Sequence, residues 1–368
     1  MAYRDLREFV AALESRGWLK RVTASVSPVL EMAAIADKVV KEGGPAILFE
    51  NVEGSRMPVL VNAYGSEARM ALALGVSDLA EIAASLEGLM KIEIPEGGFF
   101  EKLKGLGQLS RVLKFPPKHV SRGACQEIVQ ESPDLGTLPV LQCWPKDAGR
   151  FVTLGQVITK DRATGRRNVG IYRLQVYDAQ TLGMHWHPHH DGARNFESWR
   201  DAGAKMPVAV ALGGDPALAY AASAPLPPGF DEYLFAGFLR NDNVDLVPCK
   251  TVDLEVPADA EIVLEGFVDP AERHLEGPFG DHTGFYTEPR EFPVLRLSAV
   301  THRKSPIYPA TVTGRPPEED YFIGNATARI FLPMLKMSLP EVVDIHFPPA
   351  GIFHNFAFVS IDKRFPLH

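Results

Sequence analysis

A cluster of four histidines is the densest set of side chains in this sequence that could do chemistry. The stretch GMHWHPHHD places His185, His187, His189 and His190 close together, with Asp191 directly after them. Metal sites need several deprotonated nitrogen or oxygen donors that converge on one point, and such a cluster can supply them. Any one histidine is more often a partly buried, hydrogen-bonded ring than a ligand. The clustering therefore favours a metal or cofactor site and leaves open which rings bind.

Asn168 and Arg173 precede the cluster and indicate that the same site also holds an anion. An arginine keeps its charge, and its planar fork fits a carboxylate or a phosphate. The run 168–177 is rich in residues that favour strands, and its alternation predicts Ile171 and Arg173 on one face and Tyr172 on the other. The anion site and the histidine cluster would then lie on two neighbouring strands.

Glu276 and Asp281 have the spacing of a general acid and a general base. They flank a Gly-Pro-Phe-Gly turn in LEGPFGDHTGFY, and glycines let a backbone come close to a ligand. A solvated loop with two ordinary surface acids is the alternative. If Asp281 is partly buried, its pKa would be raised enough for it to donate a proton.

The pattern around these residues predicts an α+β fold with a β-rich central unit over residues 116–306. Its expected strands are 151–160, 168–177, 183–187, 207–212, 247–256, 261–268 and 292–302, with helices at 193–202 and 231–239. Short runs bounded by Gly, Pro and Asp are typical of a barrel or a sandwich. Pro188 argues that the strand beginning at 183 stops or bulges before His189.

An N-terminal α/β unit is expected over residues 1–115. Asp5 can cap a helix with Leu6, Phe9, Val10 and Leu13 on one stripe. A second helix is expected from 27–28 to 43–44, strands at 46–49 and 58–62, and a third helix at 78–90 capped by Ser77. The segment GLGQLS at 105–110 resembles a dinucleotide fingerprint only faintly, and we interpret it as a linker.

A third unit, 307–368, is expected to begin an α/β domain, with a helix at 318–337 and strands at 342–346 and 356–361. About fifty residues close a core only marginally, so we expect a truncated chain.

Composition limits the classes of function. The chain has 368 residues, is 46% hydrophobic and carries a formal net charge of −8, which argues against nucleic acid or an anionic membrane as its main partner. No apolar run is long enough for a membrane span. The three cysteines, Cys125, Cys143 and Cys249, are far apart and indicate reduced thiols in the cytoplasm.

Together these segments resemble the UbiD family of prenylated-FMN-dependent carboxy-lyases. The shared motifs are NVGIYR at 168–173, the histidine run before GAR at 192–194, PPGFDEYLFAGFLR at 227–240, LEGPFGDHTGFY at 275–286 and GRPPEED at 314–320. The resemblance covers nearly the whole chain. It implies a central split barrel of the flavin-reductase type and reversible, non-oxidative decarboxylation of an aromatic or α,β-unsaturated acid, such as a 4-hydroxybenzoate-type acid.

The resemblance also implies roles for single residues. The catalytic trio would be Arg173, Glu276 and Asp281. The positions contacting prenylated FMN would be Asn168, Ile171, Tyr172, Arg173, His185, Trp186, His187, His190 and Asp191. The ligands of a divalent metal, usually Mn²⁺, that binds the flavin phosphate would be Asn168, Glu232 and either His189 or His190. Ser223 corresponds to a position where some relatives hold a monovalent cation such as K⁺.

The family resemblance also implies partners. A flavin prenyltransferase of the UbiX type would supply the cofactor, and the full-length protein would form a homodimer or a higher homo-oligomer. An aspartate at position 281 places the chain with the quinone-pathway branch and with aryl-acid relatives. The substrate itself is not fixed by the trio.

Two other interpretations remain open at this point. One is a metal-dependent hydrolase or dioxygenase in which His185, His187 and His189 bind a catalytic metal with an open position. The other is a cofactor-binding relative that has lost activity. Against the first, the cupin-type order of histidines and glutamate is not met in this sequence.

Overall fold

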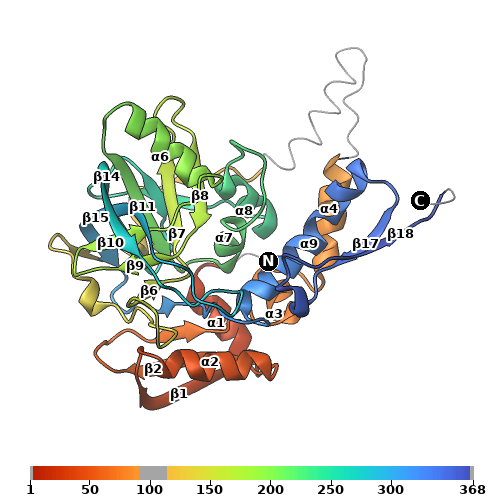
Figure 1. The fold of residues 1–368 in the computed structure, drawn as a ribbon, viewed down its shortest axis with the longest axis horizontal. Helices are drawn as coiled ribbons and strands as arrows, with labels where there is room; N and C mark the ends of the chain where they lie inside the picture. Colours follow the sequence, from red (N-terminus) through yellow and green to blue (C-terminus); the bar gives the residue numbers. More distant parts are fainter. Residues whose placement is uncertain (1–2, 91–113, 365–368) are drawn as a thin grey trace.

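A curled, nine-stranded antiparallel sheet forms the centre of the computed structural model, which describes residues 3–90 and 114–364 (Figure 1). Its path runs β6-β9-β10-β15-β14-β11-β7-β8, and β5 pairs with β15. The strands are β5 (Ile128–Gln130), β6 (Phe151–Val152), β7 (Gln156–Lys160), β8 (Arg167–Ile171), β9 (Leu174–Val176), β10 (Thr181–Met184), β11 (Met206–Leu212), β14 (Ile262–Glu276) and β15 (Arg290–His302). The curled sheet confirms the β-rich central unit, while its flavin-reductase type stays a prediction.

The middle of the sheet is apolar on both faces. Every residue of β11 is buried, as expected for a continuous Val- and Ala-rich run covered from both sides. Helix α6 (Asp191–Asp201) contacts β7, β8, β11 and β14. This packing fixes the strand ends from which the site residues project.

The hairpin of β14 and β15 carries one site residue at its far end. Glu276 is the last residue of β14 and pairs with Arg290 of β15. The pairing register shifts between Val268 and Arg273, which bends the hairpin. The loop after Glu276 therefore folds back over the mouth of the barrel.

Three predicted strands of the central unit are each broken in the structure. The run 151–160 forms β6 and β7, which lie apart in the sheet. The run 168–177 forms β8 and β9, with Tyr172 and Arg173 between them, and the run 247–256 forms β12 (Asp245–Pro248) and β13 (Glu255–Pro257). These last two strands build a separate three-stranded sheet with β4 (Lys118–His119). The two predicted helices are present as α6 and α8 (Glu232–Arg240), and helix α7 (Pro216–Ala221) was not predicted.

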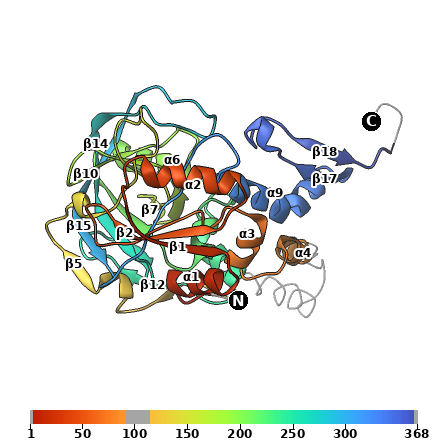
Figure 2. The ribbon, with the colours of Figure 1, turned by 90° about the horizontal axis from the view of Figure 1, so that it is seen from below.

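The N-terminal unit is a small sheet flanked by helices (Figure 2). Its strands, in order, are β1 (Leu19–Val26), β2 (Ala46–Val52), β3 (Val59–Val61) and β16 (Tyr308–Pro309). Its helices are α1 (Leu6–Ser15), α2 (Glu31–Lys41), α3 (Glu67–Ala73) and α4 (Leu79–Met90). Strand β16 comes from the start of the predicted third unit, so that unit begins by pairing with the N-terminal sheet.

The expected cap of the first helix is confirmed, because Asp5 accepts hydrogen bonds from the backbone N–H groups of Arg7 and Glu8. Other N-terminal predictions need correction. Helix α2 begins at Glu31 rather than at 27–28, and β1 and α3 were missed. The cap of α4 is Asp78, which accepts the N–H of Ala80, rather than Ser77. The predicted linker at 105–110 lies outside the described residues.

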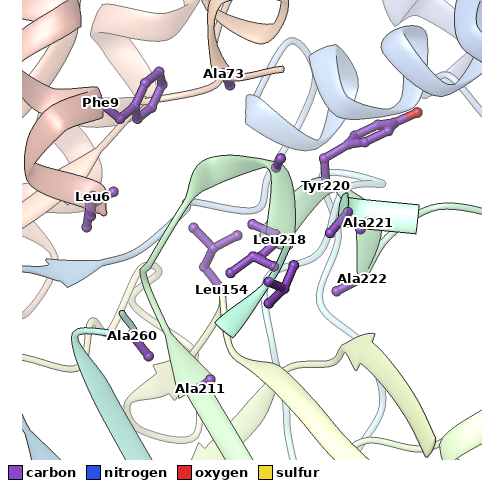
Figure 3. Close-up of a cluster of buried hydrophobic side chains, with 14 of the residues drawn as sticks. Leu6, Phe9, Ala73, Leu154, Ala211, Leu218, Tyr220, Ala221, Ala222 and Ala260 are labelled. Atoms are coloured by element: carbon purple, nitrogen blue, oxygen red, sulfur yellow. The ribbon is translucent and has the colours of Figure 1, made fainter. Parts of the chain in front are cut away.

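One apolar core joins the N-terminal unit to the barrel (Figure 3). Leu6 and Phe9 of α1 belong to the same buried cluster as Leu218 and Tyr220 of α7. Asp215 caps α7 and also accepts the N–H of Tyr3 at 3.0 Å. The barrel and the N-terminal unit are therefore packed as neighbours, which fixes α7 beside the site.

The third unit consists of α9 (Glu319–Ser338), β17 (Val342–His346) and β18 (Phe358–Ile361), close to the predicted bounds. Helix α9 packs against α3 and α4, and the β17–β18 hairpin projects from the body (Figure 1). Phe356 and Phe358 are exposed on this projection. None of the helices in the described part of the chain combines the length and apolar character that crossing a membrane requires.

Candidate active site

A cleft of about 730 Å³ opens between the barrel mouth and α9. Seven residues singled out from the sequence line it: Ile171, Tyr172, Arg173, His185, His190, Ser223 and Asp281. The opposite wall is apolar and comes from α9, including Ile323, Phe331 and Leu335. The cleft thus brings together residues from segments that are far apart in the sequence.

Arg173 and Glu276 form a bidentate ion pair at one end of the cleft. The Arg173 Nε donates to Glu276 Oε1 at 2.7 Å, and Nη2 donates to Oε2 at 3.0 Å. Arg173 lies in the break between β8 and β9, so Ile171, Tyr172 and Arg173 all reach the cleft and the predicted strand alternation is wrong there. The guanidinium also lies 4.4 Å from the ring centroid of Phe279.

The burial of Glu276, which is 1% exposed, would by itself raise its pKa. Hydrogen bonds from His185 and Arg173, together with the positive charge of Arg173, hold the pKa below its ordinary value. The expectation that Arg173 keeps Glu276 ionised fits this geometry. Such a charge-assisted, two-point pair is rigid and geometrically specific.

Asp281 completes the trio, and its protonation differs from the expected one. Its Oδ2 lies 3.4 Å from Arg173 Nη1, and its Oδ1 lies 2.8 Å from both the backbone N and the ring Nδ1 of His282. Burial would raise the pKa of Asp281, but hydrogen bonds from His282 and nearby positive charge lower it. The prediction of a raised pKa is therefore wrong, because His282 was not recognised as its partner.

The same contact raises the pKa of His282, chiefly through the hydrogen bond to Asp281 and partly through the negative charge of Asp320. In the free chain, the proton shared by this pair therefore resides on the imidazole. We call the group of Arg173, Glu276, Asp281 and His282 the reaction end of the cleft.

Three side chains that the sequence analysis missed hold the turn between Glu276 and Asp281. Gln175 accepts the N–H of Gly277 at 2.8 Å, and Asp147 accepts the N–H of Gly280 at 2.7 Å. Trp144 covers Gly280 so closely that a Cβ at position 280 would lie 2.1 Å from the indole. A larger residue at position 280 would clash with Trp144, so close packing requires glycine there in addition to the predicted backbone flexibility. The second glycine of the turn was the only sequence signal for this brace.

Thr287 is another contact that sequence reasoning missed. Its hydroxyl accepts a hydrogen bond from Arg173 Nη2 at 3.1 Å. Arg173 thus has oxygen partners from β14, from the turn and from the segment before β15. Nothing in the spacing of Thr287 distinguishes it from an ordinary loop threonine.

The histidine cluster divides between two neighbourhoods. Strand β10 ends at Met184, so Pro188 lies in an irregular segment as expected. His185 Nδ1 lies 3.1 Å from Glu276 Oε2, and His185 Nε2 lies 3.0 Å from His187 Nε2. His185 therefore supports the reaction end.

The two adjacent histidines differ in position. His189 is exposed, and its ring stacks on that of His187 with centroids 5.6 Å apart. His190 lines the cleft, and burial and the neighbouring histidines lower its pKa to about 4. A neutral imidazole that faces the cleft is the form that can bind a metal.

Besides Asn168 and His187, two predicted cofactor contacts do not line the cleft. Trp186 is 6% exposed and packs on Phe196, with ring centroids 5.8 Å apart, and it does not line the cleft. Asp191 begins α6 and forms an ion pair with Arg194. The structure therefore does not bring these two residues into the cleft wall.

We call the group of Tyr172, His190, Asn168 and Glu232 the cofactor end. Tyr172 and His190 line the cleft, whereas Asn168 and Glu232 lie beside Tyr172 and do not line it. Asn168 is buried, and its Nδ2 has no hydrogen-bond partner. Glu232 Oε2 accepts the N–H of Val169 at 3.0 Å, which brings the start of α8 to β8. Burial raises the pKa of Glu232 to about 7.

Tyr172 connects these groups. Its ring centroid lies 5.1 Å from that of His190, and its hydroxyl accepts the N–H of Gly192 at 3.3 Å. Burial raises the pKa of Tyr172, while the Gly192 N–H and the adjacent Asn168 side chain lower it. The Glu232 carboxyl, the Asn168 amide and the neutral His190 imidazole thus surround one tyrosine. Of these groups, the buried Asn168 Nδ2 lacks a hydrogen-bond acceptor in the described part of the chain.

Metal binding by the protein's own side chains finds limited support. Across residues 3–90 and 114–364, no group of three or more His, Cys, Asp or Glu side chains is arranged to hold a metal ion. A site built from His185, His187 and His189 is therefore not supported. The set of Asn168, Glu232 and one histidine has only two side chains of those types, so it would depend on Asn168 and on an oxygen from a bound ligand.

Family profiles match most of the chain. The profile of the 3-octaprenyl-4-hydroxybenzoate carboxy-lyase Rift-related domain matches residues 118–316. The N-terminal and C-terminal domain profiles of the same carboxy-lyase match residues 10–86 and 321–368. A protein of Archaeoglobus fulgidus is 53% identical over 367 residues, which are 100% of this chain and 76% of that protein. That this chain is truncated stays a prediction.

Solved structures agree with these matches. An evolved dimeric form of the UbiD-class enzyme HmfF from Pelotomaculum thermopropionicum, in complex with prFMN, has a TM-score of 0.84 and 33% identity. That comparison covers 99% of this chain and 80% of HmfF. The closed form of the vanillic acid decarboxylase of Sedimentibacter hydroxybenzoicus also has a TM-score of 0.84, with 29% identity and coverage of 99% and 75%.

Proposed function

The chain belongs to the UbiD family, and we propose that it is a carboxy-lyase that removes CO₂ from an aromatic or α,β-unsaturated carboxylic acid with prenylated FMN as cofactor. The observation that supports this most is the reaction end, where Arg173 holds Glu276 in a bidentate pair and faces Asp281. An arginine beside two carboxylates can orient a substrate carboxylate, and one of the carboxyl groups can supply a proton next to it.

The cofactor end fits the phosphate of a flavin and a divalent metal such as Mn²⁺. Asn168 Nδ2 is buried without an acceptor in the described part of the chain, burial raises the pKa of Glu232, and His190 is the histidine of its pair that faces the cleft. We assign Asn168, His190 and Glu232 as the metal ligands for this reason. The cation would remove the cost of an ionised, buried Glu232 beside an anionic phosphate.

Bound prenylated FMN supplies the electron sink that an sp² carbon needs when CO₂ leaves. The protein's part is to position the acid and to move a proton. Arg173 orients the substrate carboxylate, and Glu276 keeps the guanidinium in place. Asp281 then delivers a proton to the carbon that has lost CO₂.

The cleft also supports a substrate class. The wall made by Ile323, Phe331 and Leu335 of α9 is apolar and lies opposite the charged trio. An aromatic ring can pack there while its carboxylate meets Arg173. A 4-hydroxybenzoate-type acid is our first candidate, and a heteroaromatic acid is the second.

Further parts of the proposal follow from the family. A UbiX-type flavin prenyltransferase would supply the cofactor, and the working protein would be a homodimer or higher homo-oligomer. Ser223 lines the cleft and is the candidate for a K⁺ position. Three free cysteines, two of them buried, support the reduced cytoplasm as the compartment.

The test is co-expression with a flavin prenyltransferase, followed by measurement of CO₂ release from hydroxybenzoic, heteroaromatic and cinnamic acids. We expect release by the co-expressed protein and none by the Glu276→Gln variant. A colourless protein that is active with a divalent metal alone would contradict the proposal and would favour a metal-dependent hydrolase.

A further inference from the structure

The proton that the reaction consumes must come from outside the trio. Decarboxylation of a carboxylate takes up one proton per turnover, because RCOO⁻ and H⁺ give RH and CO₂. Asp281 holds no spare proton in the free chain, since its pKa is lowered and it faces the permanent charge of Arg173. A group beside Asp281 must therefore hold the proton and refill the carboxylate after each turnover.

His282 is the group in contact with Asp281 that can hold this proton. Its ring Nδ1 lies 2.8 Å from Asp281 Oδ1, and its side chain is 32% exposed, whereas that of Asp281 is 21% exposed. Arg173 cannot serve because a guanidinium does not deprotonate in proteins. His282 also lines the cleft, so it lies between solvent and the proton donor.

The third unit supplies the other groups that face His282. The ring of His354 lies 4.9 Å from that of His282, and its Nδ1 is 2.9 Å from the carbonyl of Ile352. Burial lowers the pKa of His354, and the charge of His282 lowers it further, so His354 is favoured as a neutral ring beside a charged His282. Asp320 of α9 favours a positive charge on His282, and Arg173 opposes it.

Phe353 closes the apolar side of this arrangement. Its ring centroid lies 6.2 Å from His282 and 5.9 Å from Tyr321 of α9. A Cβ at Gly324 would lie 2.9 Å from the Phe353 ring, so the packing between α9 and this segment is close. The contact between the barrel loop and the third unit therefore holds the His282 ring against Asp281.

We propose that His282 relays protons from solvent to Asp281, an inference that rests on the proposed decarboxylase function. The imidazolium gives its Nδ1 proton to Asp281 Oδ1, which leaves a neutral imidazole and a carboxylic acid. Asp281 gives that proton to the substrate carbon after CO₂ has left and becomes a carboxylate again. The imidazole then takes one proton from water, which restores the starting state and balances the reaction.

The first test separates CO₂ release from product formation in the holoenzyme. His282→Asn keeps an N–H near the position of Nδ1 but has no transferable proton. We expect the first equivalent of CO₂ to appear at nearly the wild-type rate and the protonated product to appear on the order of 10²-fold more slowly, the low end for a positioned proton-transfer group. His119→Asn is the matched control, since His119 is an exposed histidine paired with Glu255 and remote from the cleft.

Chemical rescue distinguishes a relay from a structural role. Added imidazole should restore product formation in His282→Ala, and it should not restore it in Asp281→Asn, where the donor itself is missing. Equal slowing of CO₂ and product in His282→Asn, or the absence of rescue in His282→Ala, would overturn the proposal.

A second measurement does not depend on activity. Nitrogen-15 spectra of histidine-labelled protein, assigned with His282→Asn, should show that the pKa of His282 lies above its ordinary value and falls in Asp281→Asn. An unchanged His282 pKa in Asp281→Asn would overturn the relay. If no acid is decarboxylated by the wild-type holoenzyme, the proposed function fails, and the spectra still decide whether the proton is held on His282.

Discussion

The reaction end and the cofactor end differ in how completely their polar groups find hydrogen-bond and ion-pair partners within the protein. At the reaction end, Arg173 has oxygen partners on Glu276, Asp281 and Thr287, and each carboxylate also has a histidine partner. At the cofactor end, the Asn168 Nδ2 has no acceptor in the described part of the chain, and burial raises the pKa of Glu232. The difference indicates that the reaction end is organised before ligands arrive, whereas the cofactor end is completed by them.

The largest effect is expected when the proton donor is removed from the reaction end. Asp281→Asn keeps the shape but has no acidic proton, so product formation should fall by on the order of 10²–10⁴-fold. Deuterium exchange at the product carbon in heavy water should be lost as well, since it uses the same proton transfer. Retained exchange with lost decarboxylation would place the donor elsewhere.

The stability of the organised end should depend strongly on Arg173. Arg173→Met removes the bidentate partner of the buried Glu276 and leaves His185 beside it, which should lower the free energy of unfolding by about 3 kcal/mol. The double variant Arg173→Met/Glu276→Gln removes the uncompensated charge and should recover most of this loss. Denaturant unfolding of the ligand-free single and double variants measures this loss and its recovery. Equal free energies of unfolding for the single and the double variant would show that the ion pair is not pre-organised.

At the cofactor end, a substitution should raise the free energy of unfolding rather than lower it. Asn168→Leu removes an unpaired buried N–H group, so the ligand-free chain should become more stable by about 1 kcal/mol. The same variant should bind flavin and metal less tightly than the wild type. If the ligand-free Asn168→Leu variant were as destabilised as Arg173→Met, the cofactor end would be as organised without ligands as the reaction end, and the proposed difference would be wrong.

The smallest effect is a pH dependence of stability from the pair of Asp281 and His282. The lowered pKa of Asp281 gives stability that is lost as pH falls below about 4, and the raised pKa of His282 gives stability that is lost as pH rises above about 6.5. Asp281→Asn should therefore destabilise the chain by about 1 kcal/mol near pH 5.5 and by less near pH 9. A loss that grows toward pH 9 would contradict the assigned charges.

Much of the site could be predicted from the sequence because its residues lie in short, distinctive segments. The Arg173 and Glu276 positions, the turn between Glu276 and Asp281 and the end of the strand before Pro188 follow from motif and turn chemistry. The break between β8 and β9 could not be predicted, because the apolar run through Tyr172 reads as one strand. Helix α7 was missed because a short, buried, Ala-rich segment has no amphipathic stripe.

The protonation states of the site residues were harder to predict than their positions. The expectation for Asp281 considered burial alone and missed that His282, the next residue, turns its ring back onto the carboxylate. Asp320 and His354 reach the cleft only because α9 and the segment after it fold over the barrel mouth. Such contacts depend on the tertiary arrangement of distant segments, which local patterns do not encode.

The most direct test of the account is the flavin and metal content of two matched variants purified after co-expression with a flavin prenyltransferase. Glu276→Gln should retain both flavin and metal at wild-type stoichiometry, because the reaction end does not hold the cofactor. Glu232→Gln should lose flavin and metal together. Loss of flavin from Glu276→Gln, or full retention of flavin by a metal-free Glu232→Gln protein, would contradict the division of the cleft into a reaction end and a cofactor end.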